Sequence, residues 1–301
     1  MMHAFVDHAA LYLNQIEAHV ARLPSLSTTA TKVMKTCNDP HSSPNDLNRL
    51  IALDPVLAGQ VLQLINSAYY SIPQPVSSLS RAIIMLGVNT VKNLVLSLAI
   101  IDHFRTAKPF RTLSNATFWS HSVAVGVIAK CIAEIQGVPL ADQEDYFVGG
   151  LMHDLGKILL NHQFSAEYHQ AMAFAKRSHG SMVHAERIIF GIDHGTVGGL
   201  IARKWRLSPA FGDVLALHHR LDDILADSAP LVLTVALANL YAQALETDSQ
   251  EGSLLKDKLA TLVMARLEIE ANMLERMRHR VLAEIDKAKI FLEASQSESR
   301  S

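Results

Sequence analysis

Histidine and aspartate side chains interrupt the apolar segments in the second half of this chain, and their types and spacing could support chemistry. His153 and Asp154 lie side by side in GLMHDLGKILL (150–160). The further candidates fall in separate helical patterns and are His121, His194, His218, His219 and Asn239. Borderline divalent metals favour imidazole nitrogen, and one carboxylate can bridge two ions. We therefore predict a divalent metal site wherever the fold brings these side chains together.

A lysine follows the His-Asp pair at helical spacing. Lys157 is four residues after His153 and three after Asp154, which places it on the same helix face. From there its ammonium group could neutralise a phosphate bound at the metal. Neighbouring helix residues point about 100° apart, so other helices must complete the ligand shell. His218 and His219 close a helix, where the helix dipole favours a cation.

Each of these residues also has a simpler interpretation. His121 could hydrogen-bond a backbone carbonyl group, and His153 with Asp154 could form a buried ion pair that fixes the register of two helices. His194 could lie exposed at the start of a helix, and Lys157 could be a surface lysine. In that case the chain would be a helical scaffold, and alanine at these positions would change stability only.

The elements that must position these side chains are helices. Apolar residues recur at helical spacing almost throughout, and no stretch alternates convincingly with period two. Asp54-Pro55 and Ser208-Pro209 have the pattern of a capping residue followed by proline in the first helical turn. Asp193 can cap the helix that begins at His194. We predict an all-α protein of a dozen or more helices.

Composition narrows the classes of protein that remain. The chain has 301 residues, 49% of them hydrophobic, and a net charge of −2. This length supports a substantial core, and near-neutral charge gives no reason to expect nucleic acid or an anionic membrane as partner. Cys37 and Cys131 form neither a CxxC pair nor a disulfide framework, which favours a reducing cytoplasm. The N-terminus lacks a signal-peptide pattern, and the apolar run 229–245 is predicted to be a buried core helix.

The chain divides into four predicted regions. A polar break around residues 104–113 separates two helical lobes. We expect an N-terminal helix over 1–22, a helical lobe over 23–108, a second lobe with the metal-type pocket over 109–245, and amphipathic helices with a frayed tail over 246–301. The first and last regions could serve homodimer formation or partner docking, although ordinary core packing gives the same apolar stripes.

The order of the candidate residues resembles the HD superfamily of metal-dependent phosphohydrolases. Several segments are similar to the HDOD family, the HD-related output domain: the run from LPSLSTTA to NSAYYS (23–71), SSLSRAIIMLG, GGLMHDLGKILL and ERIIFGIDHGTVGGLIARKWRLSPAF. The similarity covers about residues 23–240. It implies a two-lobed, all-α, HD-domain-like bundle and a role in bacterial signal transduction.

The resemblance also implies a ligand set. His121, His153 and Asp154 match the family's first metal position, and Asp154, His194, His218 and His219 match the second. Iron, manganese, zinc or magnesium would be the ion. Asn239 stands where the first position is closed by an aspartate, and its amide brings no charge, so we expect weaker binding there. The glycine-tyrosine-proline motif that follows the paired histidines in the HD-GYP branch is absent, so cyclic-di-GMP hydrolysis is not supported.

Two functions remain open. One is a regulatory module whose metal pocket binds a small ligand or a signalling protein, as the resemblance implies for a family usually regarded as non-catalytic. The other is a metal-dependent phosphohydrolase or phosphodiesterase acting on a nucleotide or phosphorylated metabolite. In that enzyme Asp154 would bridge the ions and Lys157 would steady the phosphate. The loss of a carboxylate at Asn239 favours the module, and the retained histidines favour the enzyme.

Overall fold

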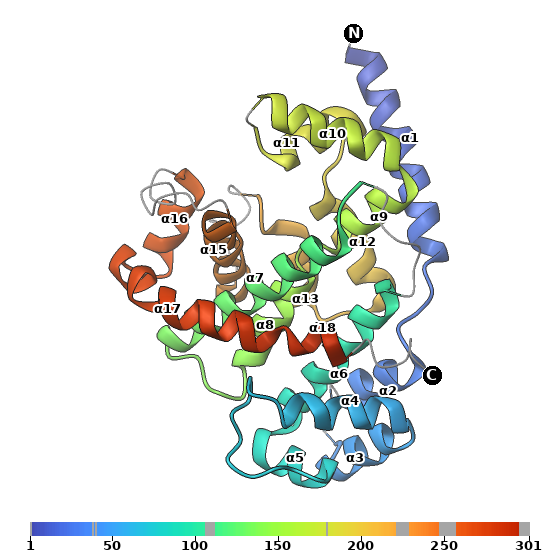
Figure 1. Cartoon of the computed structure of the whole chain (residues 1–301). Helices are drawn as coiled ribbons and strands as arrows, with labels where there is room; N and C mark the ends of the chain where they lie inside the picture. The colour runs from blue at the N-terminus through green and yellow to red at the C-terminus, as the bar shows by residue number, and fades with distance from the viewer. Residues whose placement is uncertain are drawn as a thin grey trace.

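The computed structural model describes residues 2–37, 39, 41–105, 112–178, 180–220, 229–246 and 257–294. Within these residues every regular element is an α-helix, which confirms the predicted fold class. The helices form two lobes, one below the other in Figure 1, with the long helix α6 reaching from one to the other. Part of the predicted break (106–111) and the predicted frayed tail (295–301) lie outside the described residues.

The N-terminal lobe consists of four short helices and the longer α6, and side chains cap α3, α4 and α5. It contains α2 (Thr28–Cys37), α3 (Pro44–Ala52), α4 (Pro55–Ile65), α5 (Leu79–Leu86) and α6 (Val88–Arg105). Asp54 caps α4 as predicted, because its carboxylate accepts a hydrogen bond from the Leu57 amide at 3.1 Å. Ser78 caps α5, and Gly87 ends it with a φ of +86°, a conformation that glycine adopts without strain.

The second lobe holds the candidate site. It contains α7 (Asn115–Ile135), α8 (Gln143–Met152), α9 (Leu155–Gln163), α10 (Ser165–Ser178), α11 (Met182–Phe190), α12 (His194–Trp205), α13 (Pro209–Leu217) and α15 (Pro230–Glu246). Helices α7, α8 and α15 pack against one another at its centre, and α12 packs between α9 and α13. The predicted core helix is α15, which is buried along most of its 17 residues.

Helix α7 is long and apolar enough to cross a membrane, but 67% of that apolar window is buried inside the protein. Helices α5 and α6 pass the same test only if taken together, and they are bent by 117°. Buried core helices of this kind need no membrane to cover them. The described helices therefore fit the interior of a folded bundle.

Two glycines bring the site helices into close contact. A Cβ atom at Gly150 on α8 would lie 2.6 Å from the Cα atom of Gly126 on α7. A Cβ atom at Gly156 on α9 would lie 2.0 Å from the carbonyl oxygen of His194 at the start of α12. Both approaches are too short for any side chain. Glycine at these positions therefore allows α8 to lie against α7 and α9 to lie against the start of α12.

The terminal helices cover both lobes. They are α1 (Met2–Arg22), α16 (Lys258–Arg266), α17 (Ala271–Ala288) and α18 (Ile290–Ala294), so the described part of the C-terminal region has three helices. Helix α17 packs on α7, and α18 reaches the N-terminal lobe (Figure 1). Phe291 is fully buried, with its ring 4.7 Å from that of Phe147. These helices are therefore part of the core that joins the lobes, not only a surface layer.

Candidate metal centre

The predicted histidines and Asp154 come from five helices and meet at one place. His121 lies within α7, His153 ends α8, Asp154 precedes α9, His194 begins α12, and His218 and His219 follow α13. Their ligand atoms fall into two groups that share Asp154, and within each group these atoms lie within 4.8 Å of one another. We call His121, His153 and Asp154 the first half-site, and Asp154, His194, His218 and His219 the second half-site. Their role as metal ligands stays a prediction.

The His-Asp pair lies at a joint between two helices rather than inside one helix. His153 follows the last residue of α8 and still has helical dihedral angles. Asp154 comes next, with φ −99° and ψ 9°, directly before α9 begins. The contact of Gly156 with the carbonyl of His194 holds the start of α12 against this joint. The joint therefore turns both side chains of the pair toward the same space.

The carboxylate of Asp154 divides the site. Its Oδ2 atom lies 3.3 Å from Nε2 of His153 and 3.9 Å from Nε2 of His121. Its Oδ1 atom lies 3.1 Å from Nε2 of His194 and 3.6 Å from Nε2 of His218. Each oxygen thus faces one half-site, which is the arrangement of a carboxylate that can bridge two ions.

Backbone carbonyl groups orient two of the imidazoles. Nδ1 of His153 donates to the carbonyl oxygen of Gly150 at 2.7 Å, and Nδ1 of His218 donates to that of Val214 at 2.9 Å. A carbonyl oxygen can only accept, so the hydrogen must be on Nδ1. In the neutral ring the lone pair is then on Nε2, which points toward Asp154 and can bind a metal; Nε2 of His218 also lies 3.3 Å from Nε2 of His194.

Carboxylates orient two further imidazoles. Nδ1 of His194 lies 2.6 Å from Oε2 of Glu186, and Nδ1 of His121 lies 2.8 Å from Oε1 of Glu246. Such outer carboxylates fix the ring and strengthen it as a ligand. Neither glutamate was predicted. Glu186 interrupts an apolar helix face and is fully buried, so the criterion that selected the histidines would have found it.

Burial and charge set the protonation of His153 and His194 in opposite directions, whereas burial lowers the pKa of His218 and His219 as it does that of His153. Burial lowers the pKa of His153 to about 4, so this ring is neutral. Burial also disfavours the charged form of His194, but the carboxylates of Glu186 and Asp154 outweigh it and raise the pKa to about 9. Burial works against the charge of Asp154 as well, yet His153, Lys157 and His194 hold its pKa well below the usual range.

Lys157 and Asn239 lie at the first half-site. Nζ of Lys157 is 2.6 Å from Oδ2 of Asp154, and its side chain is only 16% exposed, so it is not a surface lysine. Oδ1 of Asn239 is 3.1 Å from Nε2 of His121 and accepts a hydrogen bond from Nε2 of Gln243 at 3.0 Å. The amide oxygen of Asn239 therefore lies next to His121, where it could bind a cation, but it adds no negative charge to the first half-site.

The residues present fit a divalent cation. Nε2 of His153 and Oδ1 of Asp154 are buried and make no hydrogen bond, although Oδ1 has the ion-pair contact with Nε2 of His194 at 3.1 Å. Buried polar atoms are rarely left in this state. Both atoms face the space between the imidazoles, and both are good metal ligands. A cation held there would satisfy them.

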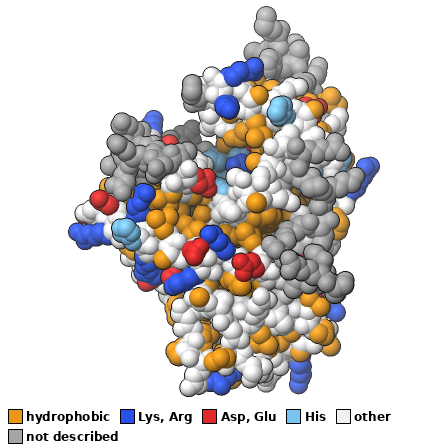
Figure 2. All heavy atoms as spheres, viewed as in Figure 1, with side chains coloured by type: hydrophobic (Ala, Val, Ile, Leu, Met, Phe, Trp, Pro, Cys, Tyr) orange, Lys and Arg blue, Asp and Glu red, His pale blue; other side chains and the backbone are white. Residues whose placement is uncertain are grey.

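The site reaches solvent along one edge. Figure 2 shows histidine side chains within a hollow of the surface, with acidic and basic side chains beside it. The side chains of His121 and Lys157 are 13% and 16% exposed, whereas those of His153 and His194 are fully buried. A ligand from solution would therefore meet the first half-site before the second.

An all-α bundle with a His-Asp pair at a helix joint, surrounded by imidazoles from other helices, defines the class of HD-type domains. The family model of the HDOD domain matches residues 23–221, which is more than half of the chain. This chain belongs to the HDOD family, which confirms the resemblance. The match ends before Asn239, so one ligand position of the first half-site lies outside it.

Solved structures and a curated relative agree with this assignment. An HDOD domain protein of unknown function from Geobacter sulfurreducens is 26% identical, with a TM-score of 0.78 over 95% of this chain and 98% of that chain. A candidate phosphohydrolase from Shewanella amazonensis is 20% identical, with a TM-score of 0.70 over 92% and 97%, and shows the same fold. An uncharacterized protein of Treponema pallidum is 23% identical over 239 residues, which are 75% of this chain and 43% of that protein. This chain thus spans less than half of that relative.

Proposed function

We propose that this chain is a regulatory HDOD module of bacterial signal transduction, and that its metal centre binds a small anionic ligand, a phosphorylated one above all. The observation that carries the proposal is the asymmetry around Asp154. The second half-site has three imidazoles and the buried carboxylate of Glu186 behind one of them. The first half-site has an amide and a lysine where a second ion would need negative charge. This asymmetry suits binding better than two-metal hydrolysis.

The donor set favours some metals over others. His194, His218 and His219 with Asp154 offer three nitrogen atoms and one oxygen. Nitrogen-rich sites suit iron, manganese or zinc, whereas magnesium prefers oxygen ligands. When bound, such an ion would attract an oxygen atom of a phosphate group as a Lewis acid.

Side chains at the exposed edge of the site would contact the anionic ligand. Lys157 neutralises Asp154 at 2.6 Å and is the positive group at the edge that reaches solvent. An anionic ligand at this edge would draw the ammonium group toward itself, since a charge-assisted hydrogen bond is available to it there. Movement of Lys157 would release Oδ2 of Asp154 and so connect ligand binding to the first half-site.

Metal content tests the proposal. The full chain, purified without chelator, should hold about one equivalent of iron, manganese or zinc by mass spectrometry, as one complete half-site predicts. Inorganic phosphate should bind in calorimetry to this protein and should not bind after treatment with a chelator. Protein that takes up no metal after supplementation would contradict the proposal and would favour the simple helical scaffold.

The second candidate function is an active metal-dependent phosphohydrolase. It is favoured by the retention of five histidines around Asp154 and by the contact of Lys157 with that carboxylate. Wild type and Asn239→Asp should be compared on p-nitrophenyl phosphate and bis-p-nitrophenyl phosphate. Turnover by wild type would support the enzyme. Turnover by Asn239→Asp alone would identify a degenerate catalytic site, and turnover by neither would leave the regulatory module.

A further inference from the structure

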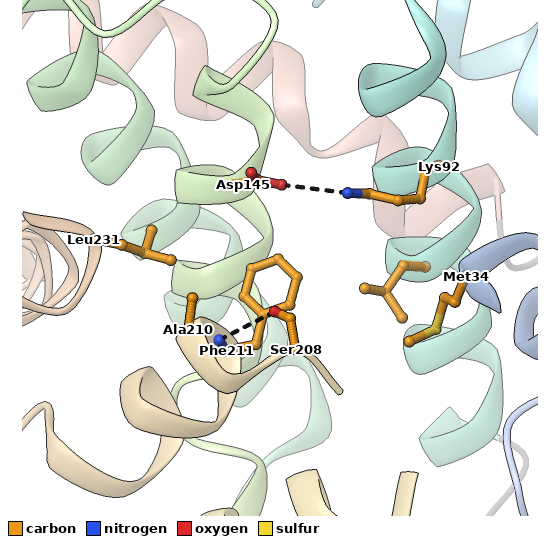
Figure 3. Close-up of a pocket in the computed structure, with 8 residues that line it drawn as sticks. Met34, Lys92, Asp145, Ser208, Ala210, Phe211 and Leu231 are labelled. Carbon is orange, nitrogen blue, oxygen red and sulfur yellow. Dashed lines mark hydrogen bonds and ion pairs between the residues drawn. The ribbon is translucent and has the colours of Figure 1, made fainter. Parts of the chain in front are cut away.

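A second cavity lies between the two lobes, away from the metal centre. Figure 3 shows it between α2 and α6 of the N-terminal lobe on one side and α8, α13 and α15 on the other. Its volume is about 180 Å³. This is smaller than the roughly 300–1,000 Å³ of sites for drug-sized ligands, so an occupant would be small.

The walls of this interlobe cavity are mainly apolar. The apolar side chains are Met34, Leu96, Ala210, Phe211 and Leu231. Ser208 also lines the cavity, but its hydroxyl group is used as the cap of α13, where it accepts a hydrogen bond from the Phe211 amide at 3.5 Å. The apolar surface comes from both lobes, so an apolar group in the cavity would contact both.

Two opposite charges face the same cavity. Nζ of Lys92 and Oδ1 of Asp145 point toward each other across it in Figure 3, and they are 3.9 Å apart. This distance is longer than a direct hydrogen bond, so each group can bond another partner. Asp145 is held in place by Asn93, whose Nδ2 atom donates to Oδ1 at 2.7 Å. The cavity thus presents one fixed negative group and one longer, adjustable positive group.

We propose that the interlobe cavity binds a free α-amino acid with an apolar side chain. The ligand carboxylate would accept from Lys92, and the ligand ammonium would donate to Asp145, because charge-assisted hydrogen bonds of both signs are then made at once. The ligand side chain would lie against Met34, Phe211 and Leu231. A purely apolar ligand would leave the two charges unused, and an anion alone would face Asp145.

The cavity is connected to the metal centre by three helices. Three residues that line the cavity lie eight positions before residues of the metal centre: Asp145 before His153, Ala210 before His218, and Leu231 before Asn239. Eight residues of helix span about 12 Å, so two turns of α8, α13 and α15 join the two places. An amino acid that changes the spacing of these helices would therefore change the geometry of the metal centre.

Calorimetry with the full chain tests the proposal, and it is carried out on protein with and without metal. L-leucine and L-methionine should bind in both states, so the result does not depend on the proposed metal function. L-leucinamide lacks the carboxylate and N-acetyl-L-leucine lacks the ammonium, and each should bind at least about tenfold more weakly. Absence of L-leucine binding up to millimolar concentration, or equal binding of the three compounds, would overturn the proposal.

Variants locate the binding. Lys92→Met should abolish L-leucine binding, and Ala210→Leu should abolish it by filling the cavity while both charges remain. Lys289→Met is the matched control, because Lys289 is an exposed lysine that follows the end of α17 and has an acidic partner, Asp286. Normal L-leucine binding by Ala210→Leu, shown by circular dichroism to be folded, would overturn the assignment to this cavity. Metal affinity that is equal with and without L-leucine would overturn the connection between the two sites.

Discussion

The two half-sites of the metal centre use opposite faces of one carboxylate, yet their surroundings differ. Around Oδ1 of Asp154 the second half-site is buried except at His219, and the carboxylate of Glu186 contacts Nδ1 of His194 on the far side of its ring. Around Oδ2 the first half-site reaches solvent, Lys157 already contacts the oxygen, and Glu246 lies near the exposed end of α15. A shared ligand therefore does not imply two equal ion sites.

This comparison indicates which half-site would bind an ion strongly and which would respond to a ligand. The second half-site has the features of a permanent ion site, since Asp154, His194 and His218 are buried and only His219 is partly exposed. The first half-site has groups that solvent can reach and that can exchange partners. We expect the first ion to be held at the second half-site and any ligand response to come from the first.

Removal of the shared carboxylate would break both half-sites at once. In Asp154→Asn we expect metal affinity to fall by at least about 100-fold at both positions. The metal-free variant should also lose about 3–5 kcal/mol of stability, because Lys157 and His194 would then lack their common partner. Metal analysis and urea unfolding measure the two effects. Asp213→Asn, at an exposed position of α13, is the control and should change neither.

The pH dependence of metal-free protein should separate His194 from the neutral histidines of the centre. His194 has a folded pKa of about 9 and an unfolded pKa near 6.5, so its contribution is complete below pH 6.5 and is lost as the pH rises through 9. His153 has a folded pKa of about 4, so its contribution is complete above pH 6.5 and is lost as the pH falls through 4.

The matched variant for this test is Glu186→Gln, which removes the carboxylate that raises the pKa of His194. Between pH 6.5 and 9, urea unfolding of wild type should show an extra loss on the order of 3 kcal/mol that the variant lacks. The acidic loss below pH 6.5 should be alike in both. An equal alkaline loss in both proteins would contradict the assigned charge of His194.

Restoring a carboxylate should make the half-sites more alike. Asn239→Asp places a negative charge next to His121, and we expect the first half-site to gain about 10-fold or more in metal affinity. A second equivalent of metal should then appear in titrations. Asn239→Ala removes the amide oxygen and should lower the same affinity. Unchanged stoichiometry in Asn239→Asp would show that charge does not limit the first half-site.

Removal of the lysine should have the smallest effect. In Lys157→Met, Oδ2 of Asp154 loses its ammonium partner, so metal affinity of the first half-site should rise by about threefold to tenfold. Phosphate affinity should fall in the same variant. Lys258→Met, at an exposed position of α16, is the control for calorimetry of both ligands. Stronger phosphate binding by Lys157→Met would rule out the lysine as an anion contact.

Much of the fold was predictable because helix signals are local. Asp54-Pro55 and Ser208-Pro209 begin α4 and α13, and Asp193 caps α12, as their side-chain chemistry requires. The C-terminal helices were predicted less well. Their sequence is amphipathic, but the burial of Phe291 depends on a partner, Phe147, that lies far away in the chain.

The candidate site was predictable to the extent that its residues interrupt apolar faces. Polar groups in such faces need a partner, which is why the histidines and Asp154 were selected. Glu246 gave no such signal, because a glutamate near an exposed helix end is ordinary. The position of Lys157 on the face of Asp154 followed from helix spacing, but its 2.6 Å contact did not.

The sequence by itself determined the helices, their ends and the kinds of ligand available, because hydrophobic periodicity and capping act over a few residues. Only the tertiary structure decided which oxygen of Asp154 faces which imidazoles, and that Lys157 and Glu186 belong to different half-sites. The physical reason is that these relations depend on the packing of α7, α8, α9, α12, α13 and α15, whose contacts join residues as far as 118 positions apart.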